Sequence, residues 1–248
     1  MNEIDHVSAV ISAAGRGSRM GWERNKLLLP LSGKSILQRT LEALTEVREI
    51  DHFVLVIRPE DEATVREEIL SGIKALTRER VTLCFGGDTR EASTWCGLQH
   101  LPEEARTVLI HDGARPFVEP DLIRTMLFEM AQTAADGVIC AVPVKDTIKV
   151  VQHGVVETTP RRSSLYAVQT PQIFRRSVLQ RAYEKARGEE VETTDDAQIV
   201  EIFGGTVHVV EGSYSNIKIT TPEDLLLGET ILREREGGYA LPANGDRL

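Results

Sequence analysis

The regular alternation of short apolar runs with helical patterns most constrains the fold of this chain. The runs are continuous rather than alternating in polarity, which is typical of strands buried on both faces of a mostly parallel sheet. They predict six strands, at residues 7–13, 53–57, 81–85, 107–111, 137–142 and 207–211. This β-α-β order predicts an α/β fold with a doubly wound, mostly parallel sheet, which binds ligands at the carboxyl ends of its strands.

Helical patterns fill the segments between the predicted strands, and two of them carry clear start signals. Ser35, with Gln38 three residues later, is typical of a capping box. Thr221 followed by Pro222 predicts the start of the last helix. The predicted helices cover residues 35–47, 60–76, 91–100, 120–133, 177–186, 194–203 and 222 to about 234.

One segment, from residue 144 to about 165, is rich in Val, Thr and Ile but has no helix signal. Residues 149–152 and 155–158 flank His153-Gly154, which predicts a two-stranded hairpin with a tight turn. A lone two-stranded ribbon is marginal in water, so this β-arm should pack against something, for which a second copy of the chain is a natural candidate. We expect one domain over residues 1–236 that includes the arm, and a frayed tail at 237–248.

Composition excludes several classes of partner. The net charge of −9 and pI near 5.3 argue against nucleic acid and against an anionic membrane surface. The three cysteines lie far apart and have no metal-ligand spacing, which favours a reducing compartment. The N-terminus has no signal-peptide pattern, and no stretch reaches ~18 apolar residues, so we expect a soluble, cytoplasmic protein.

A glycine- and arginine-rich loop, Ala13-Ala14-Gly15-Arg16-Gly17-Ser18-Arg19-Met20-Gly21, follows the first predicted strand, and Lys26 comes soon after it. Glycine lets the backbone approach a ligand closely, and cationic side chains bind phosphate oxygens, so the loop predicts a polyphosphate site. The glycine spacing does not fit a dinucleotide fingerprint. Gly33-Lys34-Ser35 resembles the end of a P-loop, but Leu28 stands where that motif needs glycine, and we interpret it as a surface turn.

Three further motifs carry candidate binding groups. Asp88 and Ser93, after the strand predicted at 81–85, can hydrogen-bond a base or sugar, although Asp88 would also serve as a helix N-cap. Asp112 ends the strand predicted at 107–111, where a carboxylate can serve a ribose hydroxyl or Mg²⁺, or can simply form a turn. Arg162 and Lys218 are cations whose role the residues alone leave open.

Taken together, these motifs resemble the cytidylyltransferases of non-mevalonate isoprenoid synthesis, which act on 2-C-methyl-D-erythritol 4-phosphate. The resemblance covers nearly the whole chain, through AAGRGSRMG, NKLLLPL, GGDTREAS, VLIHDGARPF, AVPVKDTIK, RRSSLYAVQTPQIF, TTDDA and VEGSYSNIKITTPEDL. It implies a Rossmann-like nucleotidyltransferase domain with a protruding β-arm, a homodimer formed through that arm, and dependence on CTP and Mg²⁺.

The resemblance also implies roles for individual residues. Arg19 and Lys26 match positions that stabilise the transition state, and Arg162 and Lys218 match positions that orient the substrate phosphate. The matching nucleotide-binding positions are Ala13, Ala14, Gly15, Gly87, Asp88, Ser93 and Asp112. Further substrate contacts match Arg115, Thr147, Thr170 and Thr194, and the metal ligands are not identified. The chain departs from many relatives at Asn25 and Leu27, which flank Lys26, and at Arg161.

The implied reaction transfers CMP from CTP to 2-C-methyl-D-erythritol 4-phosphate and releases pyrophosphate. Two alternatives are also consistent with the sequence: a cytidylyltransferase for another polyol phosphate, such as ribitol 5-phosphate, and a non-catalytic nucleotide-binding module on the same fold. Retention of all four implied catalytic cations argues against the second. A nicotinamide-dependent oxidoreductase fails because the glycine spacing is wrong and the acidic ribose ligand is missing.

Overall fold

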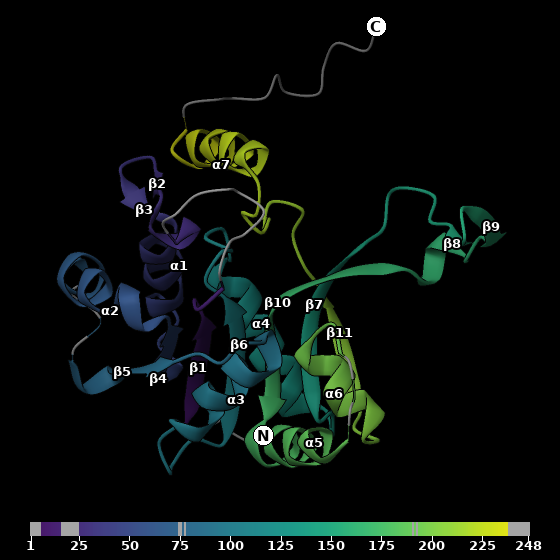
Figure 1. The fold of residues 1–248 in the computed structure, drawn as a ribbon, viewed down its shortest axis with the longest axis horizontal. Helices are drawn as coiled ribbons and strands as arrows, with labels where there is room; N and C mark the ends of the chain where they lie inside the picture. Colours follow the sequence, from purple (N-terminus) through teal and green to yellow (C-terminus); the bar gives the residue numbers. More distant parts are fainter. Residues whose placement is uncertain are drawn as a thin grey trace, which may run out of the picture.

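The computed structural model describes residues 6–15, 25–73, 76, 78–189, 191 and 193–237 of the 248-residue chain. Its centre is a seven-stranded sheet in the order β11-β7-β10-β6-β1-β4-β5 (Figure 1). Six of these strands confirm the sequence prediction and run parallel to one another. They are β1 (Val7–Ser12), β4 (Ile50–Ile57), β5 (Val81–Phe85), β6 (Thr107–Asp112), β7 (Gly137–Pro143) and β11 (Val207–Glu211).

The seventh strand, β10 (Tyr166–Arg175), was not among the predicted strands, and it lies antiparallel between β6 and β7. Its sequence contains two glutamines and a proline, and proline within a central strand normally argues against a strand. The ladder with β7 shifts register between Val168 and Gln172, so Pro171 falls where the regular pairing is interrupted. The sheet is therefore mostly parallel, as predicted, with one antiparallel strand inside it.

Helices cover both faces of the sheet, so the chain forms three layers (Figure 1). One core includes residues from α1 (Ile36–Thr45), α4 (Pro120–Gln132) and α7 (Pro222–Arg235). The other includes residues from α3 (Arg90–Gln99), α5 (Arg176–Gly188) and α6 (Asp196–Ile202). Successive residues of β1 point to opposite faces: Ile11 belongs to the first core and Val10 to the second. None of the helices in the described part of the chain is long and apolar enough to cross a bilayer.

The helix predicted over residues 60–76 is present but irregular, and it ends earlier, at Gly72. The segment consists of the 3-10 turn η3 (Pro59–Asp61), the α-turn α2 (Glu62–Thr64), the π-helical turn η4 (Val65–Ile69) and the 3-10 turn η5 (Leu70–Gly72). Val65, Ile69 and Ile73 are all buried at four-residue intervals. An α-helix of 3.6 residues per turn would rotate such residues progressively off one face, and the wider π-turn counteracts that rotation.

The predicted helix starts are correct to within two residues, with two differences at the caps. Ser35 accepts a hydrogen bond from the Gln38 backbone N–H, but the Gln38 side chain bonds Glu42, so the predicted capping box is only half formed. Thr89, rather than Asp88, caps α3. The capping box at the start of α7 is complete, with Thr221 and Asp224 as its partners.

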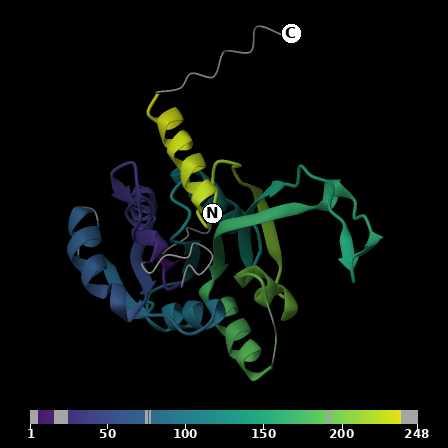
Figure 2. The same ribbon diagram turned by 45° about the horizontal axis from the view of Figure 1, so that its top comes forward.

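The predicted hairpin is present as β8 (Val150–Gln152) and β9 (Val155–Thr158). His153 and Gly154 both have positive φ, 48° and 80°, as a type I′ turn requires. This β-arm extends away from the body of the protein in both views (Figure 1, Figure 2). Every residue of its two strands is exposed.

A second short hairpin, β2 (Pro30–Leu31) and β3 (Lys34–Ser35), precedes α1 and confirms the surface turn predicted at Gly33. Nearly all of the tail predicted at 237–248 lies outside the described residues.

Gly97 brings α3 unusually close to the sheet. A Cβ atom at this position would lie 2.5 Å from Val10 Cγ1 and 2.9 Å from Val56 Cγ2, on two buried strands. We expect Gly97→Ala to destabilise the protein by about 1–3 kcal/mol, measured by urea unfolding, because the extra methyl group forces the layers apart. Gly72→Ala is the control, since its Cβ would meet only the flexible end of the Gln38 side chain, at 3.3 Å. Equal stability of the Gly97→Ala and parent proteins would contradict this close packing.

Candidate active site

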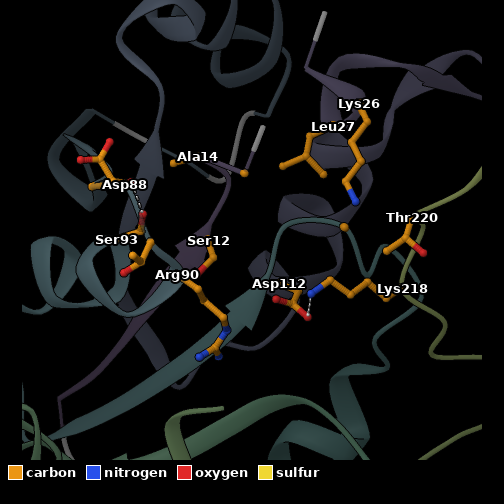
Figure 3. A pocket seen from close by; sticks show the side chains of 14 residues that line it. Ser12, Ala14, Lys26, Leu27, Asp88, Arg90, Ser93, Asp112, Lys218 and Thr220 are labelled. Atoms are coloured by element: carbon orange, nitrogen blue, oxygen red, sulfur yellow. Dashed lines mark hydrogen bonds and ion pairs between the residues drawn. The ribbon is translucent and has the colours of Figure 1, made fainter. Parts of the chain in front are cut away.

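A cavity of about 420 Å³ opens at the carboxyl ends of β1 and β6, beside the loop that follows β5 (Figure 3). This is the edge of the sheet at which the sequence predicted ligand binding. Of the predicted site residues that the structure describes, eight line the cavity: Ala14, Gly15, Lys26, Gly87, Asp88, Ser93, Asp112 and Lys218. Ser12, Leu27, Thr89, Arg90, Ala114 and Thr220 also line it and were not predicted as site residues.

The loops after β1 and β5 form one wall of the cavity and are in close contact. A Cβ atom on Gly86 would lie 2.4 Å from the Ala14 side chain and 2.8 Å from Ser93 Oγ, so this approach requires glycine. Ser93 Oγ donates a hydrogen bond to the Gly87 carbonyl oxygen, 3.2 Å away, which closes the loop on itself. The two glycine motifs, more than seventy residues apart in the sequence, therefore build a single backbone-lined wall.

The opposite side of the cavity is cationic. Lys26 and Lys218 direct their side chains into it from two separate loops, with Asp112 beside Lys218 (Figure 3). Lys218 Nζ lies 3.0 Å from Asp112 Oδ2, and Arg115 Nε lies 3.2 Å from the same oxygen. Burial alone would raise the pKa of the Asp112 carboxyl group, but the charges of Lys218 and Arg115 outweigh burial and lower it to about 2. Asp112 is therefore ionised at neutral pH and shared between two cations.

A buried hydrogen-bond network behind the cavity fixes the position of Asp112. Thr170 Oγ1 accepts a bond from the Asp112 backbone N–H and contacts His111 Nδ1 at 3.1 Å. His111 Nε2 lies 3.2 Å from the Arg115 carbonyl oxygen, which can only accept, so Nε2 carries the proton and Nδ1 accepts from Thr170. Arg115 donates in turn to the Asn216 carbonyl oxygen. Thr170 and Arg115, predicted as substrate contacts, thus both have structural partners around Asp112.

The buried imidazole of His111 makes the stability of the fold sensitive to pH. Burial lowers the pKa of His111 to about 4, against about 6.5 in an unfolded chain. Below pH 6.5 the unfolded chain gains a proton that the folded protein excludes until about pH 4. The free energy of unfolding should therefore fall by up to about 3 kcal/mol over that interval.

Urea unfolding at a series of pH values measures this contribution. His111→Gln should lose the part of the pH dependence between 6.5 and 4, even if the variant is less stable at every pH. His100→Gln, at an exposed histidine, should retain the dependence of the parent protein. An unchanged slope in His111→Gln would show that another group titrates.

Arg90 is a cavity residue that the sequence analysis did not single out. Its guanidinium pairs with Asp196, whose Oδ1 accepts a 2.5 Å hydrogen bond from the Tyr183 hydroxyl. Burial would lower the pKa of the Arg90 guanidinium, but the Asp196 carboxylate more than compensates and raises it. This buried cluster connects the start of α3, at the cavity wall, to α5 and α6. Only the fold could reveal the pair, because its members are 106 positions apart in the sequence.

Four other predicted residues that the structure describes lie away from the cavity lining. Arg162 and Thr147 are exposed near the root of the β-arm, where Arg162 Nη1 donates to the Lys145 carbonyl oxygen at 3.0 Å. Thr194 is bonded to Gln198, just before α6. Ala13 is buried, and its backbone N–H continues the ladder to Val56. Arg19 lies outside the described residues.

The described residues offer little for a metal ion held by protein alone. No group of three or more His, Cys, Asp or Glu side chains with metal-binding geometry occurs among them. Among the described residues, the carboxylates that line the cavity are Asp88 and Asp112. This donor set fits Mg²⁺ bound mainly through substrate phosphates with one or two carboxylates, which is how that ion is usually held in phosphoryl-transfer sites.

A doubly wound sheet with a cationic cavity, walled by two glycine loops at the carboxyl edge, defines a nucleotide-handling protein of the nucleotidyltransferase type. The family model for 2-C-methyl-D-erythritol 4-phosphate cytidylyltransferase matches residues 7–234. The chain is 44% identical over 233 residues to the Desulforamulus reducens protein of that name, which covers 94% of this chain and 98% of the relative. It is 48% identical over 227 residues to the Thermosynechococcus vestitus protein of the same name, covering 91% and 95% respectively.

Solved structures of proteins with the same fold point to the same family as the sequence relatives. The crystal structure of 4-diphosphocytidyl-2C-methyl-D-erythritol synthase from Anaerococcus prevotii superposes with a TM-score of 0.82 at 37% identity and covers 92% of this chain and 96% of its own. The 2-C-methyl-D-erythritol 4-phosphate cytidylyltransferase from Thermus thermophilus gives a TM-score of 0.72 at 32% identity, with 92% and 99% covered. The chain belongs to the 2-C-methyl-D-erythritol 4-phosphate cytidylyltransferase family.

Proposed function

We propose that this protein transfers CMP from CTP to 2-C-methyl-D-erythritol 4-phosphate, giving 4-diphosphocytidyl-2-C-methyl-D-erythritol and pyrophosphate. The observation that carries the proposal is the cavity itself. Lys26 and Lys218 extend into it from one side, opposite the backbone wall built by the two glycine loops. Two cations from separate loops suit a reaction that must bring two anionic substrates together.

The reaction needs no general base. The second pKa of a phosphomonoester is about 6, so the attacking oxygen is already anionic near neutral pH. A new bond forms between this oxygen and the α-phosphorus of CTP, and the bond from that phosphorus to the leaving pyrophosphate breaks in line. The obstacles are repulsion between the anions and the charge that develops in the transition state, and preorganised cations reduce both.

The residues of the proposed site would divide this work between them. Lys26, with Arg19, would neutralise the triphosphate, while the wall at Gly87, Asp88 and Ser93 would hold the nucleoside. Lys218 would bind the incoming phosphate, and its ion pair with Asp112 keeps its ammonium group at the cavity before that phosphate arrives. Arg115 shares the same carboxylate oxygen, so Asp112 remains paired when Lys218 turns toward a phosphate.

Mg²⁺ bound to the CTP phosphates would neutralise further charge, and Asp112 and Asp88, which line the cavity, would supply its carboxylate ligands.

We further propose that the protein works as a homodimer in which the β-arm joins two chains. Val151, Val155 and Val156 on the arm are 52%, 67% and 53% exposed, a large apolar surface for a two-stranded ribbon. Arg162 at the root of this arm does not line the cavity of its own chain. A second copy that covers the arm would account for both observations and would bring Arg162 to the cavity of the partner.

Pyrophosphate release tests the proposed reaction. With CTP and Mg²⁺, 2-C-methyl-D-erythritol 4-phosphate should support turnover, and ribitol 5-phosphate should support much less. ATP, GTP and UTP in place of CTP test recognition of the base in the same assay. Preferred turnover of ribitol 5-phosphate would reassign the acceptor, and no turnover with any pair would favour a non-catalytic role.

A further inference from the structure

Asn25, the residue before Lys26, is buried and fully hydrogen-bonded although it lies beside the open cavity. Its exposure is 2%, and it caps the 3-10 turn η2 (Lys26–Leu28). Its Oδ1 accepts from the Leu27 backbone N–H at 3.0 Å. Its Nδ2 donates to the Ala13 carbonyl oxygen at 3.1 Å and to Asp61 Oδ2 at 2.7 Å. Both amide hydrogens and the amide oxygen therefore have partners, which fixes the side chain in one orientation.

These bonds connect Lys26 to the sheet. Ala13 directly follows β1, and its backbone N–H donates to the Val56 carbonyl oxygen on β4 at 2.8 Å. The bond from Asn25 to Ala13 therefore joins the residue before Lys26 to the point at which the chain leaves the sheet. The two partners are twelve positions apart in the sequence, and a single hydrogen bond from the amide connects them directly.

Asp61 holds the other amide hydrogen and is itself locked in place. Arg58, directly after β4, donates to the two Asp61 oxygens from Nε and Nη2 at 2.8 and 3.0 Å. Asp61 is 5% exposed, so this carboxylate is buried. A buried carboxylate needs a donor, which requires the Asn25 amide nitrogen, rather than its oxygen, to face Asp61. The orientation of Asn25 is thus set from β4.

We propose that Asn25, held by Asp61 and Ala13, is a positioning residue that fixes Lys26 at the cavity for catalysis. This inference rests on the proposed role of Lys26 in turnover. Asn25 does not line the cavity, so it acts only through the backbone that it anchors. A small displacement of a reacting group is costly, and losses near 10²-fold for a shift of about 1 Å are typical.

A double-mutant cycle tests the proposal with three variants, Asn25→Ala, Lys26→Ala and the combination of both. Asn25→Ala should lower kcat by about 10–100-fold and leave KM for the polyol phosphate unchanged. When Lys26 is already alanine, the further change at Asn25 should have no additional effect on kcat. The loss of thermal stability caused by Asn25→Ala should be the same in both backgrounds. This contrast separates positioning of Lys26 from general destabilisation.

Two other variants distinguish the hydrogen bonds that the Asn25 amide donates to Ala13 and Asp61 from the one that its oxygen accepts from Leu27. Asn25→Ser keeps an acceptor for the Leu27 N–H but has no amide donors, so it should not restore kcat. Asp61→Asn should lower kcat in the same way as Asn25→Ala, because it removes the charged carboxylate that accepts the hydrogen bond from the Asn25 amide. Ser35→Ala removes the N-cap of α1, away from the cavity, and should reduce stability without lowering kcat.

Two results would overturn the inference: equal fold-losses from Asn25→Ala with and without Lys26, or full activity in Asn25→Ser. Near-normal turnover in Lys26→Ala alone would be a different failure. It would remove the proposed role of Lys26 and, with it, the reason to position that residue.

Discussion

Replacement of Lys26 with alanine is expected to lower turnover by about 10²–10³-fold while the protein keeps its native fold. The ammonium group enters the cavity, whereas the backbone of Lys26 is held by η2 and by the Asn25 side chain. Truncation at Cβ therefore removes the charge and leaves the supporting contacts in place. The loss should fall mainly on kcat, because the neutralising charge matters most as the pyrophosphate departs.

Lys34→Ala is the matched control for this experiment. Lys34 is a nearby lysine on β3, and it pairs with Glu42 at 2.7 Å on the surface, outside the cavity lining. A surface ion pair of this kind is worth little, so both turnover and stability should stay close to those of the parent protein. Circular dichroism and thermal unfolding of both variants would confirm the native fold. Near-normal turnover of folded Lys26→Ala would remove Lys26 from the mechanism.

The strands could be predicted where burial left a simple pattern. β1, β4, β6 and β7 are apolar along most of their length because helices cover both faces of the sheet, and such runs stand out in the sequence. β10 could not be found in this way. Its central residues Gln169, Thr170 and Gln172 are buried and polar because they bond the ends of neighbouring elements, at Ser213, Asp112 and Asp195. A strand used to support a site has a polar pattern that resembles a loop.

The same distinction applies to the candidate site. Ala14 and Gly87 come just after β1 and β5, and Asp112 is the last residue of β6, so their meeting at one edge of the sheet follows from the parallel course of these three strands. The ion pair between Lys218 and Asp112 cannot be derived from the strand order, because it depends on the path of the chain after β11. The residue roles implied by the family resemblance covered Lys218, but they gave no indication of Arg90 and its partner Asp196. The local sequence pattern of the strands predicts the edge of the sheet at which ligands bind. The contacts between residues distant in the sequence determine which charged side chains lie together there.

Mixing two inactive variants, Lys26→Ala and Arg162→Ala, is expected to restore about a quarter of the parent activity if the proposed dimer shares its sites. Random exchange of equal amounts makes half of the dimers mixed. In each mixed dimer one of the two sites has both its lysine and its arginine, because they come from different chains. The measurement is pyrophosphate release after the subunits have exchanged, with exchange itself verified by tagged chains.

Lys26→Ala mixed with Lys218→Ala is the decisive comparison, because Lys26 and Lys218 line the cavity of one chain. A mixed dimer of these two variants has one lysine missing from each site, so its activity should stay at the level of the separate variants. Arg162 is exposed at the root of the arm, and its side chain donates a hydrogen bond to the Lys145 carbonyl oxygen of the same chain. If verified exchange restores no activity with Arg162→Ala either, Arg162 must serve its own chain. The arm would then have to bend back over the cavity, which requires a different arrangement from the extended one in Figure 1.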